Sequence, residues 1–406
     1  MMGKLKEREH DFGSKLRQHA TFQRLKEYIQ WQRKCGGSSP NLELPIFSPI
    51  SINLDLTSSC NFSCPFCVDS KLINSGKSLT LEEARKTINT LHSNGLLSVI
   101  LIGGGEPTLH RDFEEIVRYI KSKKLQIGIV TNGSRLEKVE AIVEELKEKD
   151  WIRISIDAAG ERVFKELHLP KTQVTLSRIL ERAREVKKSN PVVSLGYSFV
   201  VVWEGAEING RKLCPNMDEM VRSVERAREF SFDYISFKPC LVRWNESQRE
   251  TLLKNVEKTK EEEIIDQINI RLQEVKGLAG DRVKILESSN LKAMLNRETE
   301  QIKRQPKRCH MQFFRTVVTP FGIFHCPAFR GVEAARIGDR DGYQEGRTFK
   351  ESLKKTAESI ITFDAEEECK DVGCFYNRTN WWLEEFIRSE ESVEGLEKVE
   401  NDNFFL

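Results

Sequence analysis

The chain lacks a long hydrophobic run, an apolar N-terminal segment and a strong net charge. Its longest apolar stretches, residues 96–102 and 192–203, are far shorter than the roughly 20 residues that a membrane-spanning helix needs. The first residues hold no apolar core of a signal peptide. Lys and Arg number 64 against 62 Asp and Glu, so the net charge of +2 gives no sign of nucleic-acid binding. These absences predict a cytoplasmic protein with no membrane or nucleic-acid partner.

Length and composition predict a globular protein of several domains. The chain has 406 residues, which suggests two or three domains. Hydrophobic residues make up 39% of the chain and charged residues 31%, a balance that allows a buried core. The chain has 10 cysteines without a secretion signal, which indicates a reducing compartment. Clustered cysteines there bind metal more often than they form disulfides, so their positions carry the functional information.

Strand-like and helical patterns alternate between residues 50 and 237. We expect strands at residues 50–56, 98–102, 126–130, 151–156, 192–202 and 234–237, and helices at 79–94, 112–123, 135–149, 173–189 and 217–230. Thr80 and Glu83 have the spacing of a capping box at the start of the first helix. Repeated βα units predict an α/β fold with a parallel sheet. Right-handed crossovers would curl this sheet into a partial (βα)6 barrel of the TIM type, with its chemistry on the loops after the strands.

The other parts of the chain differ in character from this core. We expect a helical leader at 1–49, the barrel core at 50–245, a helical connector at 246–308, a small α+β domain at 309–385 and an acidic tail at 386–406. The leader is expected to pack on the domain surface, with a docking arm for a partner as the alternative. The connector is expected to hold a long charged helix at 247–275, followed by a strand and a helix at 282–305. The tail is expected to be solvated, because it is rich in acidic residues.

Three cysteines follow the first expected strand in the spacing C-x3-C-x2-C. They are Cys60, Cys64 and Cys67, and they lie on one short loop. A structural zinc site normally has four ligands, and no fourth cysteine or histidine is near them in sequence. Three thiolates suit an iron–sulfur cluster with one iron left open for a substrate or cofactor. A zinc loop completed by a distant residue is the alternative.

A glycine-rich segment follows the second expected strand and ends in a carboxylate. It reads Gly103-Gly104-Gly105-Glu106-Pro107. Glycines let a ligand approach the backbone closely, and the glutamate can accept a hydrogen bond from a ligand amine. Together with the cysteine loop, this segment resembles the radical S-adenosylmethionine (SAM) superfamily over residues 50–240.

The resemblance implies both cofactors and a set of residues that hold them. In that family, three cysteines bind three irons of a [4Fe–4S] cluster, and SAM chelates the fourth. The reduced cluster cleaves SAM to methionine and a 5′-deoxyadenosyl radical, which abstracts hydrogen from the substrate. By resemblance, the cluster ligands are Cys60, Cys64 and Cys67. The residues expected to contact SAM are Phe66, Gly104, Gly105, Glu106, Asn132, Ser155, Asp157 and Lys171.

Four of these SAM contacts, Asn132, Ser155, Asp157 and Lys171, depend on looser matches. Asn132 follows the third expected strand, and a simple turn is the alternative there. Ser155 ends the fourth strand, where it could instead be a structural hydroxyl. Many relatives carry H-D-x-x-R after that strand, whereas this chain has Lys171 in place of the arginine.

A second cysteine group is spread over the last hundred residues. Its members are Cys309, Cys326, Cys369 and Cys374. The residues between the first two read as a β-hairpin, and the last two precede an expected helix at 380–387. This arrangement resembles the twitch domain, the short form of the SPASM domain of radical SAM enzymes. The resemblance implies one auxiliary [4Fe–4S] cluster, and a structural zinc ion with four thiolates is the alternative.

Three further cysteines stand alone. Cys35 lies beside a Gly- and Ser-rich link and is expected to be inert. Cys214 and Cys240 follow the fifth and sixth expected strands, so both are expected to face the mouth of the barrel. A lone cysteine is usually a small buried hydrophobic residue. In similar epimerases, however, one thiol returns hydrogen to the substrate radical, which makes both cysteines candidate hydrogen donors.

The sequence therefore predicts a radical SAM enzyme that acts on a small molecule, such as a sugar or aminocyclitol, or on a peptide. It would need an external one-electron reductant of the flavodoxin or ferredoxin type. The auxiliary cluster would accept an electron from the substrate radical, which makes the reaction an oxidation. The alternatives are a radical epimerase, a peptide-modifying maturase, an iron–sulfur protein that only transfers electrons, and a zinc-binding interaction protein.

Overall fold

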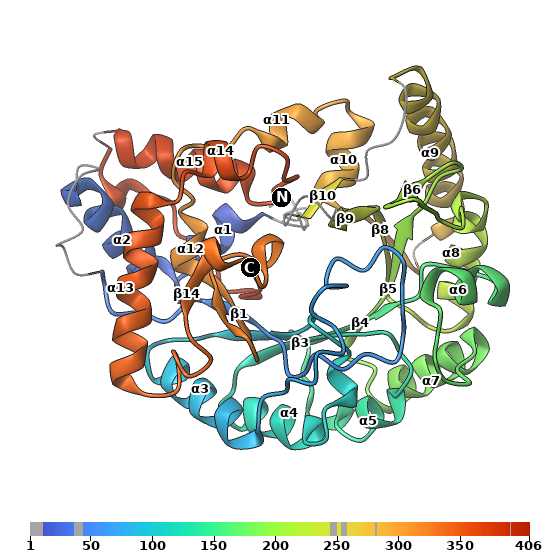
Figure 1. Ribbon diagram of the computed structural model, residues 1–406, viewed down its shortest axis with the longest axis horizontal. Helices are drawn as coiled ribbons and strands as arrows, with labels where there is room; N and C mark the ends of the chain where they lie inside the picture. The colour runs from blue at the N-terminus through green and yellow to red at the C-terminus, as the bar shows by residue number, and fades with distance from the viewer. Residues whose placement is uncertain (1–10, 36–43, 244–249, 253–257, 281, 390) are drawn as a thin grey trace, which may run out of the picture.

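The computed structural model describes residues 11–35, 44–243, 250–252, 258–280, 282–389 and 391–406. Within these residues, one sheet of 10 strands has the order β11-β8-β5-β4-β3-β2-β1-β12-β13-β14. All neighbours from β11 to β12 are parallel, and β13 and β14 are added antiparallel. Figure 1 shows the sheet curving like an open barrel, with α3 to α8 along its outer side. The predicted α/β partial barrel is confirmed.

The six predicted core strands are all present. They are β1 (Ser51–Leu54), β2 (Ser98–Leu101), β3 (Gln126–Thr131), β4 (Trp151–Ser155), β5 (Ser194–Val201) and β8 (Tyr234–Pro239). The helices that cover them are α3 (Leu81–Ser93), α4 (Phe113–Ser122), α5 (Leu136–Glu140), α6 (Glu161–His168), α7 (Leu176–Ser189) and α8 (Met220–Glu229). The sequence pattern did not predict α6, and α5 is shorter than the predicted helix at 135–149. A short hairpin of β6 (Glu207–Ile208) and β7 (Arg211–Lys212) lies between β5 and α8.

Local chemistry explains how these elements begin and which way they face. At the start of α3, the Thr80 hydroxyl accepts the Glu83 N–H at 3.2 Å, and the Glu83 carboxylate accepts the Thr80 N–H at 2.7 Å. The predicted capping box is therefore confirmed. Along β4, Ile152 and Ile154 are fully buried, whereas the alternating residues Trp151, Arg153 and Ser155 are partly accessible. This alternation separates the packed outer face of the sheet from an inner face that holds polar side chains.

The segment predicted to be a helical connector contributes strands as well. Glu250–Leu252 (β10) pairs antiparallel with Leu241–Arg243 (β9), and helix α9 covers Lys258–Ala279. Lys284–Glu287 (β11) then lies parallel to β8 and extends the barrel sheet. The single long helix predicted at 247–275 is thus wrong at residues 250–252, and parts of it, 247–249 and 253–257, lie outside the described residues. Two short helices follow, α10 (Ser289–Leu295) and α11 (Thr299–Lys303).

The second cysteine segment continues the same sheet. Its elements are α12 (Met311–Phe314), β12 (Arg315–Thr319), β13 (Gly322–Phe324), β14 (Arg336–Gly338), α13 (Gly346–Thr362), α14 (Ala365–Glu368) and α15 (Asn377–Arg388). Strands β12 and β13 form the predicted hairpin. Strand β12 also pairs in parallel with β1, with Ser51 opposite Arg315. The two cysteine-bearing parts of the chain are therefore joined edge to edge through backbone hydrogen bonds.

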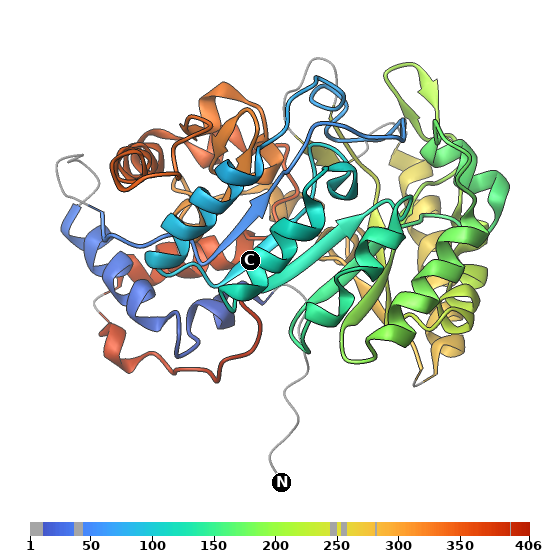
Figure 2. The ribbon, with the colours of Figure 1, turned by 90° about the horizontal axis from the view of Figure 1, so that it is seen from below.

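The leader helices pack on this C-terminal segment. They are α1 (Phe12–Leu16) and α2 (Phe22–Cys35), and Figure 2 shows them beside the orange and red elements. Leu25, Tyr28 and Ile29 of α2 share an apolar core with Phe313 and Phe314. The prediction that the leader packs as a helix is confirmed for its described residues, whereas 1–10 and 36–43 lie outside them.

The last residues contradict the prediction of a solvated acidic tail. Phe405 and Leu406 are buried, with only 7% and 3% of their surface exposed. The Phe404 N–H donates to Gln126 Oε1 at 2.8 Å, and the Ser98 hydroxyl donates to the Phe404 carbonyl at 2.9 Å. The prediction from acidic composition overlooked the three terminal apolar residues, and burial of the last two holds this segment against the barrel.

None of the helices in the described part of the chain has the length and apolar character required to cross a lipid bilayer.

Candidate active site

One cavity of about 1530 Å³ is lined by residues from both cysteine groups. Cys60, Cys64 and Cys67 reach it from the loop after β1, and Cys326 and Cys374 reach it from the C-terminal segment. Seven of the eight predicted SAM contacts also line it: Phe66, Gly104, Gly105, Glu106, Asn132, Ser155 and Asp157. Lys171 is exposed and is absent from the cavity wall. The sheet thus brings together residues that the sequence placed on separate loops.

The glycine-rich segment packs directly against the cysteine loop. A Cβ atom on Gly105 would lie 2.5 Å from the carbonyl oxygens of Thr57 and Ser59. The Glu106 N–H donates to that same Ser59 carbonyl at 2.8 Å. The sequence predicts that these glycines leave space for a ligand. At Gly105, however, the neighbouring backbone fills that space. A side chain at residue 105 would therefore displace the cysteine loop.

The three thiols of the first group lie on one loop in a poorly solvated part of the cavity. Burial raises the pKa of Cys64, and the neighbouring Cys67 and Cys60 raise it further. Burial also raises the pKa of Cys67 to about 12. Such thiols stay neutral unless a cation compensates their charge, and a metal cluster supplies that compensation. The donor set and its burial therefore fit an iron–sulfur cluster.

Glu106 is held in one orientation by its neighbours. Its Oε1 accepts from the Thr108 N–H at 3.1 Å and from the hydroxyls of Thr108 and Thr131 at 2.6 Å each. Its Oε2 accepts from the Asn132 N–H at 2.6 Å. Burial raises the pKa of Glu106, and these hydrogen bonds oppose that rise. Oε2 accepts one hydrogen bond and keeps a lone pair for a further donor in the cavity.

Two polar residues at strand ends form hydrogen bonds within the protein and also line the cavity. Asn132 donates from its amide to Asn61 Oδ1 at 2.9 Å, which ties the end of β3 to the cysteine loop. Asp157 has a positive φ of 55° and accepts the Val200 N–H at 2.7 Å. Both side chains are thus fixed before any ligand binds, which suits residues that position a cofactor.

A buried arginine connects the C-terminal segment to the cysteine loop. Arg330 Nη1 lies 2.9 Å from both carboxylate oxygens of Asp69, and its Nε lies 2.7 Å from Asp55 Oδ2. Asp69 Oδ2 also accepts the Gly104 N–H at 3.2 Å. Burial alone would raise the pKa of Asp69, but Arg330 holds it below its usual value. Sequence spacing had no signal for this contact, because Asp69 and Arg330 are 261 residues apart.

The four cysteines of the second group lie in one apolar cluster. Cys369 belongs to a core with Phe329, Phe363 and Val372, and the cysteines that pack against this core are Cys309, Cys326 and Cys374. Burial raises the pKa of Cys374, and Cys309 and Cys326 add to the rise. Among the residues with described positions, no three His, Cys, Asp or Glu side chains converge closely enough to hold a single metal ion. The thiols therefore share one region without meeting at one point.

A hydrogen-bonded chain supports the first of these cysteines. The Asn380 amide donates to Cys309 Sγ at 3.7 Å, and its oxygen accepts the His310 N–H at 2.9 Å. The His310 ring lies between Tyr28 Oη and Glu384 Oε2, at 2.8 Å from each. Tyr28 belongs to the leader, so α2 helps to position the Cys309 region.

The model of the radical SAM superfamily matches residues 54–205. Residues 54–205 therefore form a radical SAM domain. Members use a [4Fe–4S] cluster together with SAM. The matched residues include the cysteine loop, the Gly103–Glu106 segment and strands β2 to β5.

Relatives within the superfamily differ widely in what they do. The S-adenosylmethionine-dependent nucleotide dehydratase of Selenomonas ruminantium is 31% identical over 157 residues, which cover 37% of this chain and 56% of the dehydratase. The structure of SuiB from Streptococcus suis with bound S-adenosylmethionine matches with a TM-score of 0.59 at 14% sequence identity. The match covers 86% of this chain and 78% of the SuiB chain. The structure of anSMEcpe with AdoMet and a peptide has a TM-score of 0.52 at 19% identity, covering 82% and 88%. The two structural likenesses establish the fold.

His168 lies beside the first cysteine group, and the sequence pattern assigned it no role. Its Nδ1 lies 3.3 Å from Cys64 Sγ, and its Nε2 lies 2.8 Å from the Ile156 carbonyl. Burial lowers the pKa of His168, which favours the neutral ring, and the nearby Asp157 opposes this shift. If Nε2–H donates to the carbonyl, Nδ1 is left as the acceptor that faces Cys64. The sequence showed this histidine only as part of an incomplete family pattern.

The structure corrects the expected placement of the two lone cysteines. Neither Cys214 nor Cys240 is among the described residues that line the cavity. Cys240 is fully buried in the apolar core, whereas its neighbours Pro239 and Leu241 line the cavity. Cys214 lies beside Glu166, and its burial raises the thiol pKa to about 11. The expectation that both thiols face the barrel mouth is therefore wrong.

Proposed function

We propose that this protein is a radical SAM enzyme that cleaves SAM reductively and abstracts hydrogen from a substrate held in the same cavity. One observation carries the proposal. The three-cysteine loop, the glycine–glutamate segment and the polar ends of β3 and β4 all line that cavity. Each of these features follows a neighbouring parallel strand, where the chemistry of such barrels lies.

The chain's own residues take distinct roles in this proposal. Cys60, Cys64 and Cys67 hold the cluster. Glu106 accepts a hydrogen bond from the methionine ammonium of SAM. The other residues proposed to contact SAM are Phe66, Gly104, Gly105, Asn132, Ser155 and Asp157. When bound and reduced, the cluster supplies the electron that splits SAM into methionine and the 5′-deoxyadenosyl radical.

The second cysteine group is proposed to hold an auxiliary [4Fe–4S] cluster. Cys309, Cys326, Cys369 and Cys374 provide four thiols, which is the full ligand set of such a cluster. Cys326 and Cys374 line the cavity that also holds the first group. An electron leaving a substrate radical would therefore have a nearby acceptor, which favours oxidation. Epimerisation is less well supported, because Cys214 and Cys240 are outside the cavity wall.

The substrate is proposed to be a small molecule or a short peptide, and the reductant an external flavodoxin or ferredoxin. The cavity volume of about 1530 Å³ exceeds that of an ordinary single-ligand pocket, so SAM and a second molecule can share it. The relatives include a nucleotide dehydratase and SuiB, which has been solved with its precursor peptide SuiA. The chain spans only 56% of the dehydratase, so neither substrate transfers directly.

Replacing Cys60, Cys64 and Cys67 together with alanine tests the proposal. SAM cleavage by the anaerobically reconstituted protein should be lost, because no thiolates remain for the first cluster. About four irons per chain should remain, held by the second group. The matched control is Cys35→Ala, which removes a cysteine from neither group and should keep both cleavage and the full iron content. Unchanged cleavage in the triple variant, or zinc as the metal of the wild type, would overturn the proposal.

A further inference from the structure

The inner face of the sheet is polar and open between β4 and β8. Ser155 on β4 pairs in register with Ser198 on β5, which pairs with Ser236 on β8. Barrels of this kind are usually filled by branched apolar side chains at such positions. The small hydroxyl side chains leave room instead, and Ser155 and Ser198 both line the cavity. This part of the cavity is built to receive polar atoms.

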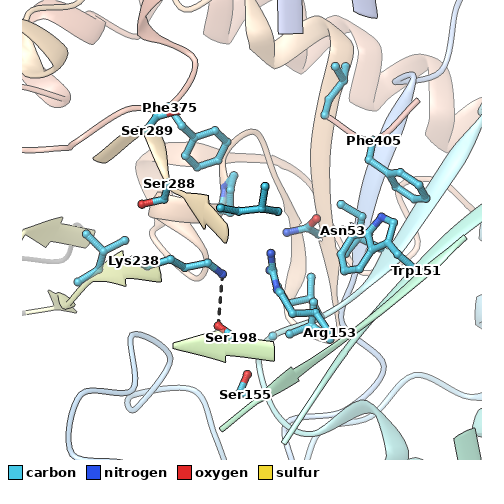
Figure 3. Close-up of a pocket in the computed structure, with 18 of the residues that line it drawn as sticks. Asn53, Trp151, Arg153, Ser155, Ser198, Lys238, Ser288, Ser289, Phe375 and Phe405 are labelled. Carbon is cyan, nitrogen blue, oxygen red and sulfur yellow. Dashed lines mark hydrogen bonds between the residues drawn. The ribbon is translucent and has the colours of Figure 1, made fainter. Parts of the chain in front are cut away.

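Arg153 reaches this region from the inner face of β4. Its guanidinium lies 5.4 Å from the centre of the Trp151 ring and extends into the cavity, as Figure 3 shows. Its Nε is buried and has no hydrogen-bond partner among the described residues. A buried guanidinium nitrogen without an acceptor is costly, unless a ligand supplies one.

Lys238 brings a second positive charge from β8. Its Nζ lies 3.5 Å from Ser198 Oγ, and Figure 3 shows the amine directed toward the region of Arg153. Burial raises the pKa of Asp157, and the charges of Lys238 and Arg153 are among the groups that oppose this rise. Its Oδ1 accepts the Val200 N–H at 2.7 Å, and its Oδ2 faces His168 Nε2 at 3.4 Å. The Val200 N–H and His168 thus hold the Asp157 carboxylate, and Arg153 and Lys238 both line the cavity.

We propose that Arg153 and Lys238, with the Ser198 hydroxyl, bind an oxyanion of the substrate, either a phosphate or a carboxylate. The guanidinium offers two parallel N–H donors, the ammonium offers a mobile charge, and the hydroxyl offers a third donor. This inference deepens the proposed function and depends on it, since it assumes that SAM occupies the neighbouring residues around Glu106. It assigns the substrate to the class of acidic small molecules or acidic peptides.

Anion binding to the anaerobically reconstituted wild type tests this site. Pyrophosphate and succinate serve as probes, and isothermal titration calorimetry is performed with and without saturating SAM. At least one probe should bind, and SAM should leave its affinity unchanged. The stronger probe identifies the oxyanion as phosphate or carboxylate. Displacement of both probes by SAM would mean that Arg153 and Lys238 bind the methionine carboxylate, which would overturn the inference.

Variants locate the binding to these residues. Arg153→Gln and Lys238→Gln should each weaken the probe by about tenfold, because each removes a charged donor. Arg162→Gln removes an exposed arginine on α6 and should leave the affinity unchanged. Arg153→Lys keeps the charge without the fork and should weaken binding less than Arg153→Gln. Equal affinity in Arg153→Gln and Arg162→Gln, or no probe binding to the wild type, would overturn the inference.

The result is separable from the proposed function. Anion binding is an equilibrium property that needs no cleavage of SAM. Wild-type protein that cleaves SAM but binds neither probe contradicts only the oxyanion site. Protein that binds a probe through Arg153 but never cleaves SAM contradicts only the proposed enzyme activity.

Discussion

At Glu106, burial and hydrogen bonding act in opposite directions on a single carboxylate. Burial disfavours its charge, while donors from Thr108, Thr131 and Asn132 favour it. These donors orient the group so that Oε2 can accept one more hydrogen bond. The sequence predicted the residue from the motif, whereas two of the donors that orient it, Thr131 and the Asn132 N–H, come from the end of β3, the next strand along the chain.

Replacing Glu106 with glutamine should weaken SAM binding by about tenfold, because a neutral amide accepts a hydrogen bond from an ammonium less strongly than a carboxylate does. Both clusters should remain, since no thiol is changed. Equilibrium dialysis with SAM measures the affinity, and iron analysis measures the clusters. Glu114→Gln makes the same chemical change on α4, where Glu114 pairs with Lys138, and should leave SAM binding unaltered. Wild-type affinity in Glu106→Gln would refute the proposed contact.

At the scale of elements, Arg330 connects its own segment to two others that lie far from it in the sequence. It belongs to the segment after Cys326 and pairs with Asp55 at the end of β1 and with Asp69 in the cysteine loop. Arg243, at the end of β9, donates to the Arg330 carbonyl at 2.8 Å. The buried arginine thus holds the C-terminal segment against the loop that carries the first cysteine group.

Replacing Arg330 with methionine should lower the free energy of unfolding by about 3–5 kcal/mol, because two buried carboxylates lose their counter-charge. Urea unfolding of the reconstituted protein, followed by circular dichroism, measures the change. Arg340→Met is the matched control, since Arg340 pairs with Glu83 in a more exposed place. That control should cost about 1 kcal/mol or less. Equal losses for the two variants would show that the buried ion pairs contribute no more than an exposed one.

Sequence patterns predicted elements well where the signal was local. The capping box of α3 and the hairpin of β12 and β13 depend on residues a few positions apart, and both are confirmed. The sequence pattern did not predict strand β10. Its three residues have charged neighbours and a helix-like pattern, and they form a strand by pairing with β9. The acidic tail was misjudged for a similar reason, since burial of its last residues depends on partners near residues 98 and 126.

At the scale of the whole molecule, the sheet decides which cysteines share a space. Parallel pairing of β12 with β1 brings the second group to the edge of the barrel, and the cavity then reaches Cys326 and Cys374. The same arrangement leaves Cys240 inside the apolar core. Under the proposed function, Cys326 and Cys374 place an electron acceptor in the cavity wall, and every cysteine among its described residues belongs to one of the two proposed ligand groups.

A solvent-isotope experiment separates oxidation from epimerisation. With a substrate that supports turnover in deuterated water, the product should carry no solvent deuterium, because no thiol returns hydrogen to it. Cys214→Ala and Cys240→Ala should both keep product formation, since neither side chain lines the cavity. Cys374→Ala should still form 5′-deoxyadenosine but lose the oxidised product. Mass spectrometry of the product is the measurement, and one deuterium in a redox-neutral product would reverse the assignment.

The sequence by itself determined the order of βα units, the cysteine loop and the glycine–glutamate segment. Each of these depends on spacing within a few residues, which local backbone geometry converts directly into structure. Only the tertiary structure determined that Arg330 contacts Asp69, that His168 faces Cys64, and that Arg153 and Lys238 line the same cavity. Those contacts arise from strand order and from the side of each strand that faces inward, and both are properties of the assembled sheet.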